Sequence, residues 1–318
     1  MTGVRVGWDG MGWDWADHED IRRRLDGGAD PERWSGGRPL HRAALFGSPE
    51  VVAELAGRVA EVDATEGGVT ALWEAVVAGK PENARALAAA GADPWRTSLG
   101  GWSPGRLSLA GPTPELFAVP AGVGLSPGER ATAEEARRLL AALGEFYYDG
   151  LGLACVAGID AAEAVRRLDG APVPDDVMEE FLDAPYDYDM DESLRFVGVT
   201  SVPGGCVVTQ PWGYAPQMPG VMARLSAGTF CYGLYANPKS GNQGSVARDG
   251  IVEAGDLHPG GGPDEGDSAE EVLRSYLYHH RAVAFACAFA GLRPVDARGV
   301  LGPPDVWIEL PDLNHWAR

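Results

Sequence analysis

Apolar and small residues recur with a period of 32 along the first third of the chain. The copies share small and apolar residues at the same places, and each has a Gly at the same offset. Three pairs of residues occupy equivalent places in successive copies: Leu40 and Leu72, Ala43 and Ala75, and Gly47 and Gly79. Self-similarity at such a period is typical of a solenoid, in which stacked copies share one core.

The two copies carry a recognisable helix-starting motif. The first reads Pro39-Leu40-His41-Arg42-Ala43-Ala44 and the second reads Thr70-Ala71-Leu72-Trp73-Glu74-Ala75. Both resemble the ankyrin repeat, whose motif is Thr-Pro-Leu-His-x-Ala. A degenerate third copy begins at Gly101, and residues 14–27 resemble half of a capping repeat. The resemblance covers residues 14–118 and implies a short helical solenoid.

Two departures from the motif affect the expected stability. Arg38 stands where the motif has Thr, and Trp73 stands where it has His. The hydrogen bonds that tie each helix start to its hairpin are therefore expected to be incomplete. A stack of about three repeats is near the minimum for such a fold, so we expect modest stability.

The rest of the chain has a different character. Residues 119–130 are rich in Pro and Gly and predict a linker. Beyond them, short alternating strands and intervening helices predict an α+β domain with a mainly antiparallel sheet over residues 131–318. Helices are expected at 131–143, with a capping box of Thr132 and Glu135, and as one long element at 268–290. The predicted organisation is an ankyrin-repeat domain at 1–118, this linker, and the α+β domain.

Four segments of the second half carry a further resemblance. Residues 151–168, 205–214, 232–237 and 248–250 are similar to a domain of unknown function common in actinobacterial proteins. That family implies no activity. The many Gly, Ala, Pro and Arg residues are also typical of a GC-rich bacterial genome.

The net charge of the chain limits the kinds of partner that we expect. The net charge is −20, and residues 119–318 carry 14 basic and 29 acidic residues, against 12 and 17 in residues 1–118. Nucleic acids and anionic membranes both require Lys and Arg against phosphate, so neither is expected as a partner. The charge fits solubility, or a basic protein partner drawn by long-range attraction.

The densest acidic stretch runs from Asp169 to Glu192, with ten acidic residues and no basic one. It begins like an EF-hand loop at Asp187, but Glu192 stands where that loop needs Gly and Gly198 where it needs Glu, so calcium is not expected. We interpret the stretch as a solvated acidic loop. Its aromatic residues favour contact with a basic protein surface through four positions: Tyr186, Asp187, Tyr188 and Asp189.

No motif for a cofactor, a metal or a catalytic residue is found. The four cysteines are widely spaced, without a CxxC pair, as in a reduced cytoplasmic protein. The nucleophile elbow, the phosphate-binding loop and the dinucleotide fingerprint are all missing. We therefore expect a non-enzymatic protein.

The resemblance to ankyrin repeats places partner contacts on hairpin tips and first helices. Residue by residue it points to Trp34, Arg42, Phe46, Trp73, Trp95 and Trp102. Aromatic residues and Arg are the usual energetic anchors of interfaces. The competing interpretation is that Phe46 and Trp73 pack inside the stack.

The sequence thus predicts a protein that binds another protein through the ankyrin platform and the acidic domain. One alternative is an immunity or inhibitor protein that neutralises a basic toxin or nuclease. A second alternative is an enzyme of unrecognised type that uses Asp187, Asp189 and His258. It requires those three side chains to converge in a pocket.

Overall fold

The computed structural model describes residues 7–8, 14–184, 187–237 and 239–317. The chain forms two compact units. Residues 1–133 and 262–279 form the first, here called the repeat unit, and residues 134–261 and 280–318 form the second, the sheet unit. Among the described residues no helix combines the length and apolar character needed to cross a bilayer.

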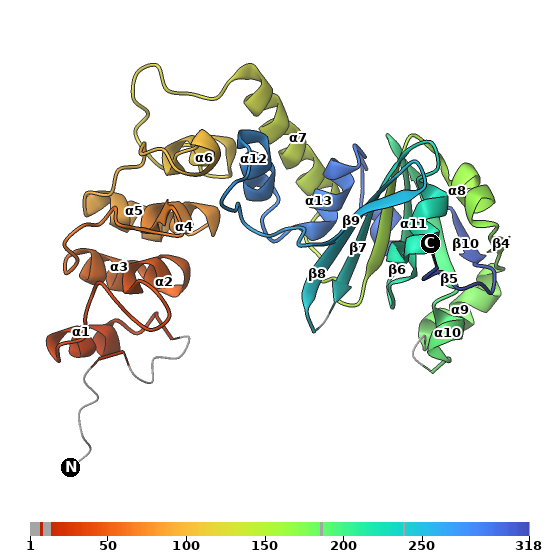
Figure 1. The fold of residues 1–318 in the computed structure, drawn as a ribbon, viewed down its shortest axis with the longest axis horizontal. Coiled ribbons are helices and arrows are strands. Elements are labelled where there is room, and N and C mark those ends of the chain that lie inside the picture. Colours follow the sequence, from red (N-terminus) through yellow and green to blue (C-terminus); the bar gives the residue numbers. More distant parts are fainter. Residues whose placement is uncertain (1–6, 9–13, 185–186, 238, 318) are drawn as a thin grey trace, which may run out of the picture. The chain divides into compact units, whose positions relative to one another are not determined.

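Pairs of short antiparallel helices build the repeat unit (Figure 1). A two-stranded hairpin, β1 Thr65–Glu66 and β2 Val69–Thr70, precedes the second pair. The helices are α1 His18–Asp26, α2 Pro39–Phe46, α3 Pro49–Ala56, α4 Ala71–Val77, α5 Pro81–Ala89 and α6 Pro104–Ala110, with a short 3₁₀ turn, η1 Leu99–Gly101, before α6.

Local chemistry explains where these helices begin. Four of them start behind a residue whose side chain accepts an N–H of the first turn: Asp17, Ser48, Thr70 and Ser103. Such caps satisfy backbone donors that have no partner within the helix. Helix α2 has no side-chain cap, because Arg38 replaces the expected Thr, and it begins with Pro39, which needs no N–H partner.

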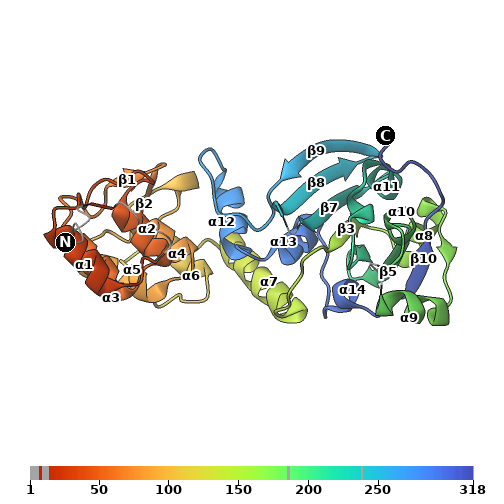
Figure 2. The same ribbon diagram turned by 90° about the horizontal axis from the view of Figure 1, so that it is seen from below.

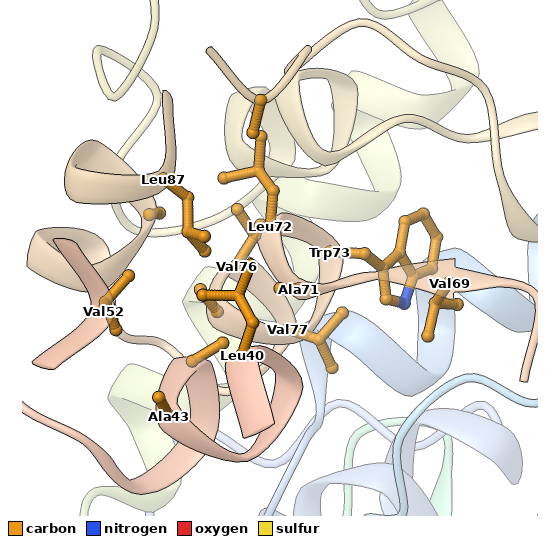
Figure 3. Packing of buried hydrophobic residues seen from close by; sticks show 14 of the residues in the cluster. Leu40, Ala43, Val52, Val69, Ala71, Leu72, Trp73, Val76, Val77 and Leu87 are labelled. Carbon is orange, nitrogen blue, oxygen red and sulfur yellow. The ribbon is translucent and has the colours of Figure 1, made fainter. Parts of the chain in front are cut away.

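The core of the stack lies between the helix pairs. Leu40, Leu72 and Leu87 pack together there with little or no exposure (Figure 3). Asn83 of α5 is also buried, and its side-chain amide donates to the carbonyls of Ala44 and Gly47, each at 3.0 Å. This side chain thus ties the end of α2 to the next repeat.

A helix from much later in the chain completes the third repeat. No helix forms between Ala110 and Pro127, which are joined by fully described residues. Instead α12, Ala269–Leu277, packs against η1 and α6 (Figures 1 and 2). The Trp102 indole N–H donates to the Ala269 carbonyl at 2.8 Å. The predicted boundary at residue 131 therefore misplaces residues 262–279, which return to the stack.

The long helix predicted at 268–290 is wrong. The chain turns between α12 and α13, Ala282–Phe289, and His280 adopts a left-handed φ of 58° there. Helix α12 begins with a capping box formed by Ser268 and Glu271. Helix α12 buries Val272 and Leu273 in the stack, whereas α13 packs on the sheet. The sequences of α12 and α13 both fit one continuous helical pattern of apolar residues, so periodicity does not indicate the turn between them.

Replacing Gly100 by alanine is expected to loosen α12. Gly100 has φ of 55°, and an added Cβ would lie 2.8 Å from Val272 Cγ2 and 3.1 Å from Ala269 Cα. Gly101 has φ of 76° and open space around the same position. Both substitutions incur the left-handed penalty of about 1–2 kcal/mol, but only Gly100→Ala adds overpacking of about 1–3 kcal/mol. Urea unfolding of the two variants measures the difference, and equal losses would contradict this packing.

Helix α7, Pro127–Leu143, begins earlier than predicted. The capping box is formed by Ser126 and Glu129: Glu129 N donates to Ser126 Oγ at 3.2 Å, and Ser126 N donates to Glu129 Oε2 at 2.7 Å. The predicted box at Thr132 is wrong, because that hydroxyl donates back to the Gly128 carbonyl at 3.1 Å. In this Ser-x-x-Glu sequence Pro127 directly follows Ser126 and takes the first helical position, which suits Pro.

One eight-stranded sheet forms the sheet unit, and every neighbouring pair is antiparallel, which confirms the predicted α+β class. The order is β4-β10-β5-β6-β3-β7-β8-β9. The strands are β3 Gly152–Ala157, β4 Ala171–Pro172, β5 Phe196–Val202, β6 Gly205–Gln210, β7 Phe230–Asn237, β8 Gly241–Arg248, β9 Ile251–Leu257 and β10 Val306–Glu309.

Helices cover the sheet (Figure 2). Val156 and Cys231 face a core shared with α8 and α11, while Cys155 of the same strand meets Cys287 of α13, with the two sulfurs 3.8 Å apart. Central strands that are buried on both faces need apolar side chains in every position, and β3 has them. The helices are α8 Ala161–Leu168, α9 Asp175–Asp183, α10 Met190–Ser193, α11 Pro219–Leu225, α13, and α14 Arg298–Leu301, with a 3₁₀ turn, η2 Ala215–Gln217.

About half of the acidic stretch is helical, so the prediction of a solvated loop is wrong over residues 175–183 and 190–192. It contains α9 and α10. Met178 and Phe181 of α9 are buried, three residues apart on one face, while the carboxylates point outward. The spacing of Met178 and Phe181 predicts a helix with one apolar face, although Asp and Glu residues surround the pair.

Candidate partner-binding surface

Three of the residues predicted to contact a partner lie together at the first repeat. The guanidinium carbon of Arg42 lies 5.7 Å from the ring centroid of Trp34 and 5.3 Å from that of Phe46. We call Trp34, Arg42 and Phe46 the aromatic row. The Phe46 side chain is 46% exposed, which is unusual for a large apolar residue in a packed stack.

The local fold explains how the row is assembled. Arg42 and Phe46 are four residues apart on α2, so they share one face of that helix. Trp34 sits in a tight turn in which its N–H donates to the Gly37 carbonyl at 2.9 Å. Its ring lies against Gly36, where a Cβ would approach within 2.3 Å, and packs edge-on against buried Trp15 at 5.4 Å. The ring is therefore held in place rather than free to rotate.

The equivalent positions in the next two repeats carry alternating charge. Glu74 and Arg106 follow Arg42 at intervals of 32 residues. Burial raises the pKa of Glu74, the nearby Glu66 raises it further, and Arg42 opposes both. Arg106 lies over Trp102 at 4.4 Å and donates to both carboxylate oxygens of Glu129, at 2.8 and 3.0 Å. The Arg106 charge is thus compensated within the unit.

Residues 276 and 279, from much later in the chain, cover the ends of α4 and α6. His279 Nδ1 lies 2.9 Å from the carbonyl of Val77, at the end of α4. The Tyr276 hydroxyl would be 2.0 Å from a Cβ placed on Gly111, at the end of α6. Sequence reasoning missed this segment, because a helix 160 or so residues downstream leaves no local signal in the repeats. Gly100 and Gly111 lie where α12 contacts the repeats, but a glycine alone does not indicate such a contact in the sequence.

Two of the predicted contact residues belong to the core. Trp73 is 2% and Trp102 is 1% exposed. Figure 3 shows the Trp73 ring beside Val69, inside the packed cluster. Their assignment to a binding surface is therefore corrected, because the helix starts turn these side chains inward. For Trp73 the competing interpretation is the right one, whereas Phe46 remains largely accessible.

Trp95 is half-buried. The Trp95 ring packs over Gly105, where a Cβ would approach the ring within 2.7 Å. The backbone N–H of Trp95 donates to Asp93 Oδ1 at 2.9 Å. The ring therefore has a fixed position in the loop between α5 and η1, with part of its surface accessible.

The predicted residues of the acidic stretch lie in the sheet unit and have unequal roles. Asp187 is exposed, and Asp189 caps α10 by accepting the N–H of Asp191 at 3.0 Å. Tyr188 is half-buried, with its ring 4.8 Å from that of Phe181. Tyr186 lies outside the described residues. The stretch presents carboxylates outward while part of its aromatic surface serves packing.

The predicted catalytic alternative does not assemble. Asp187 and Asp189 precede β5, the third strand of the sheet, while His258 follows β9, the eighth. The strands beside them, β5 and β9, are separated in the sheet by five strand spacings of about 4.8 Å each, or roughly 24 Å. His258 is exposed, and within the described ranges no three His, Cys, Asp or Glu side chains are grouped to hold a metal ion. The strand order therefore gives the catalytic alternative no support.

Comparison with known proteins identifies the repeats. A family model described as ankyrin repeats, in three copies, matches residues 16–98. No curated protein matches the chain. The first part of the chain therefore consists of ankyrin repeats, which supports a role in protein–protein interaction.

Proposed function

We propose that this protein binds another protein through the aromatic row of its first ankyrin repeat. One observation carries the proposal: residues 262–279 cover the ends of α4 and α6, while Phe46 at the equivalent end of α2 is 46% exposed. Exposed aromatic and Arg side chains that are held in place lose little entropy on binding and are the usual anchors of an interface. In the aromatic row Phe46 is exposed, while Trp34 and Arg42 are half-buried and hold fixed positions beside it.

Phe46→Ala is expected to weaken partner binding by about 2 kcal/mol, a roughly thirtyfold loss of affinity. The substitution removes the exposed ring at the end of the row and leaves the core of the stack unchanged. Affinity capture from the native host, quantified by mass spectrometry, compares the parent chain, Phe46→Ala and Tyr147→Ala. Tyr147 is an exposed aromatic residue of the sheet unit and serves as the matched control. Equal capture by Phe46→Ala and the parent would refute the proposal.

A second candidate function follows from charge. The helices α9 and α10 carry most of the ten acidic residues found between Asp169 and Glu192, and that stretch holds no basic residue. Such a surface fits an immunity or inhibitor protein that neutralises a basic toxin or nuclease. Attraction of this kind accelerates association and is screened over about 8–10 Å at physiological salt. A complex whose affinity is independent of salt would exclude this candidate.

A further inference from the structure

A groove of about 320 Å³ lies in the sheet unit between α10 and the last residues of the chain. Tyr214 and Met218 line it, together with Asp191 and Leu194 on the α10 side and residues 311–316 on the other. No motif in the sequence pointed to this groove, because its walls come from three distant segments.

The terminal wall is fixed to the rest of the unit. Gly220 N donates to the His315 carbonyl at 2.8 Å, and a Cβ on Gly220 would approach that oxygen within 2.9 Å. His315 Nε2 lies 3.0 Å from the Pro311 carbonyl, and the Trp316 ring is 5.8 Å from that of Tyr214. The groove is thus a preformed feature, as ligand sites usually are.

Its chemistry is aromatic and acidic. Asp191 and Asp312 are exposed, and among the described residues neither carboxylate has a hydrogen bond or ion pair. The one arginine in the wall, Arg195, forms an ion pair with Glu309 and donates to the Leu310 carbonyl at 3.3 Å, so its charge is already compensated. The Trp316 side chain is more than half exposed at the rim.

We infer that this groove binds an arginine side chain from a basic segment of a partner protein. The guanidinium plane would stack on Tyr214 and Trp316, as arginine does on aromatic rings. Asp191 and Asp312 would pair with its charge. This inference rests on the second candidate function only in giving the partner a basic segment, and it does not involve the aromatic row.

A tetra-arginine peptide tests the inference on the full chain at about 150 mM salt. The indole N–H signal of Trp316 in an NMR titration is expected to shift with peptide concentration. Asp191→Asn combined with Asp312→Asn is expected to weaken peptide binding at least tenfold, roughly the effect of losing 1.4 kcal/mol. Trp316→Ala should weaken it several-fold by removing one stacking partner.

The control removes the same charge outside the groove. Asp175→Asn combined with Asp176→Asn, in the exposed first turn of α9, is expected to change peptide affinity less than twofold. Equal losses from the two double variants would show general charge attraction and overturn the inference, as would an unmoved Trp316 signal. Phe46→Ala is expected to bind the peptide like the parent chain, so failure of the aromatic row and failure of the groove are measured separately.

Discussion

Trp102→Ala is expected to lower the free energy of unfolding of the repeat unit by about 3–5 kcal/mol. The side chain is 1% exposed, and its indole N–H donates to the Ala269 carbonyl of α12 at 2.8 Å. Alanine leaves a large cavity and removes the one bond from this ring to α12. Urea denaturation of the full chain measures the loss.

The control is Trp316→Ala, which removes an equally large ring from an exposed position. A surface substitution of that kind should change the free energy of unfolding by about 0.5 kcal/mol. Hydrogen exchange adds a specific readout, because the amides of Val272 and Leu273 should lose protection in Trp102→Ala. Retained protection of α12 would show that this helix does not depend on Trp102.

Gln210→Leu is expected to lower the free energy of unfolding of the sheet unit by at least about 3 kcal/mol. Gln210 is fully buried in β6. Its Nε2 donates to the carbonyls of Phe196 at 2.8 Å and Leu194 at 3.1 Å, and its Oε1 accepts the N–H of Ala215 at 2.9 Å. Leucine has a similar size but leaves these backbone groups buried without partners, at about 1–3 kcal/mol each.

Gln243→Leu is the matched control. Gln243 lies on β8 and is only partly buried, so its replacement should stay within about 0.5 kcal/mol. Urea denaturation compares both variants with the parent chain. If Gln210→Leu is as stable as Gln243→Leu, the buried amide does not organise the turn between β6 and α11.

Features encoded by neighbouring residues could be predicted from the sequence. The repeats could be recognised because Leu40 and Leu72 occupy the same place in successive copies. Strands β5 and β6 could be recognised because apolar and polar residues alternate on both sides of a Pro-Gly-Gly turn. The identity of α11 as a helix was likewise predictable from its own residues.

Features created by distant contacts could not be predicted. Helix α12 was expected as a helix, but nothing in residues 269–277 says that it joins the repeats. The aromatic row was predicted by family position, yet the same reasoning chose Trp73 and Trp102, because family position does not say which way a substituted Trp will turn. The groove between α10 and residues 311–316 needed the fold to bring its walls together.

The discontinuity of the repeat unit has a consequence for the order of events on the ribosome. Helix α6 ends at Ala110 and α12 begins at Ala269, so about 160 residues are synthesised between them. At roughly 5–20 residues per second this takes about 8–32 s. During that interval the face of the third repeat that later receives Val272 and Tyr276 has no cover. The nascent chain therefore carries a temporary apolar surface that the finished protein does not have.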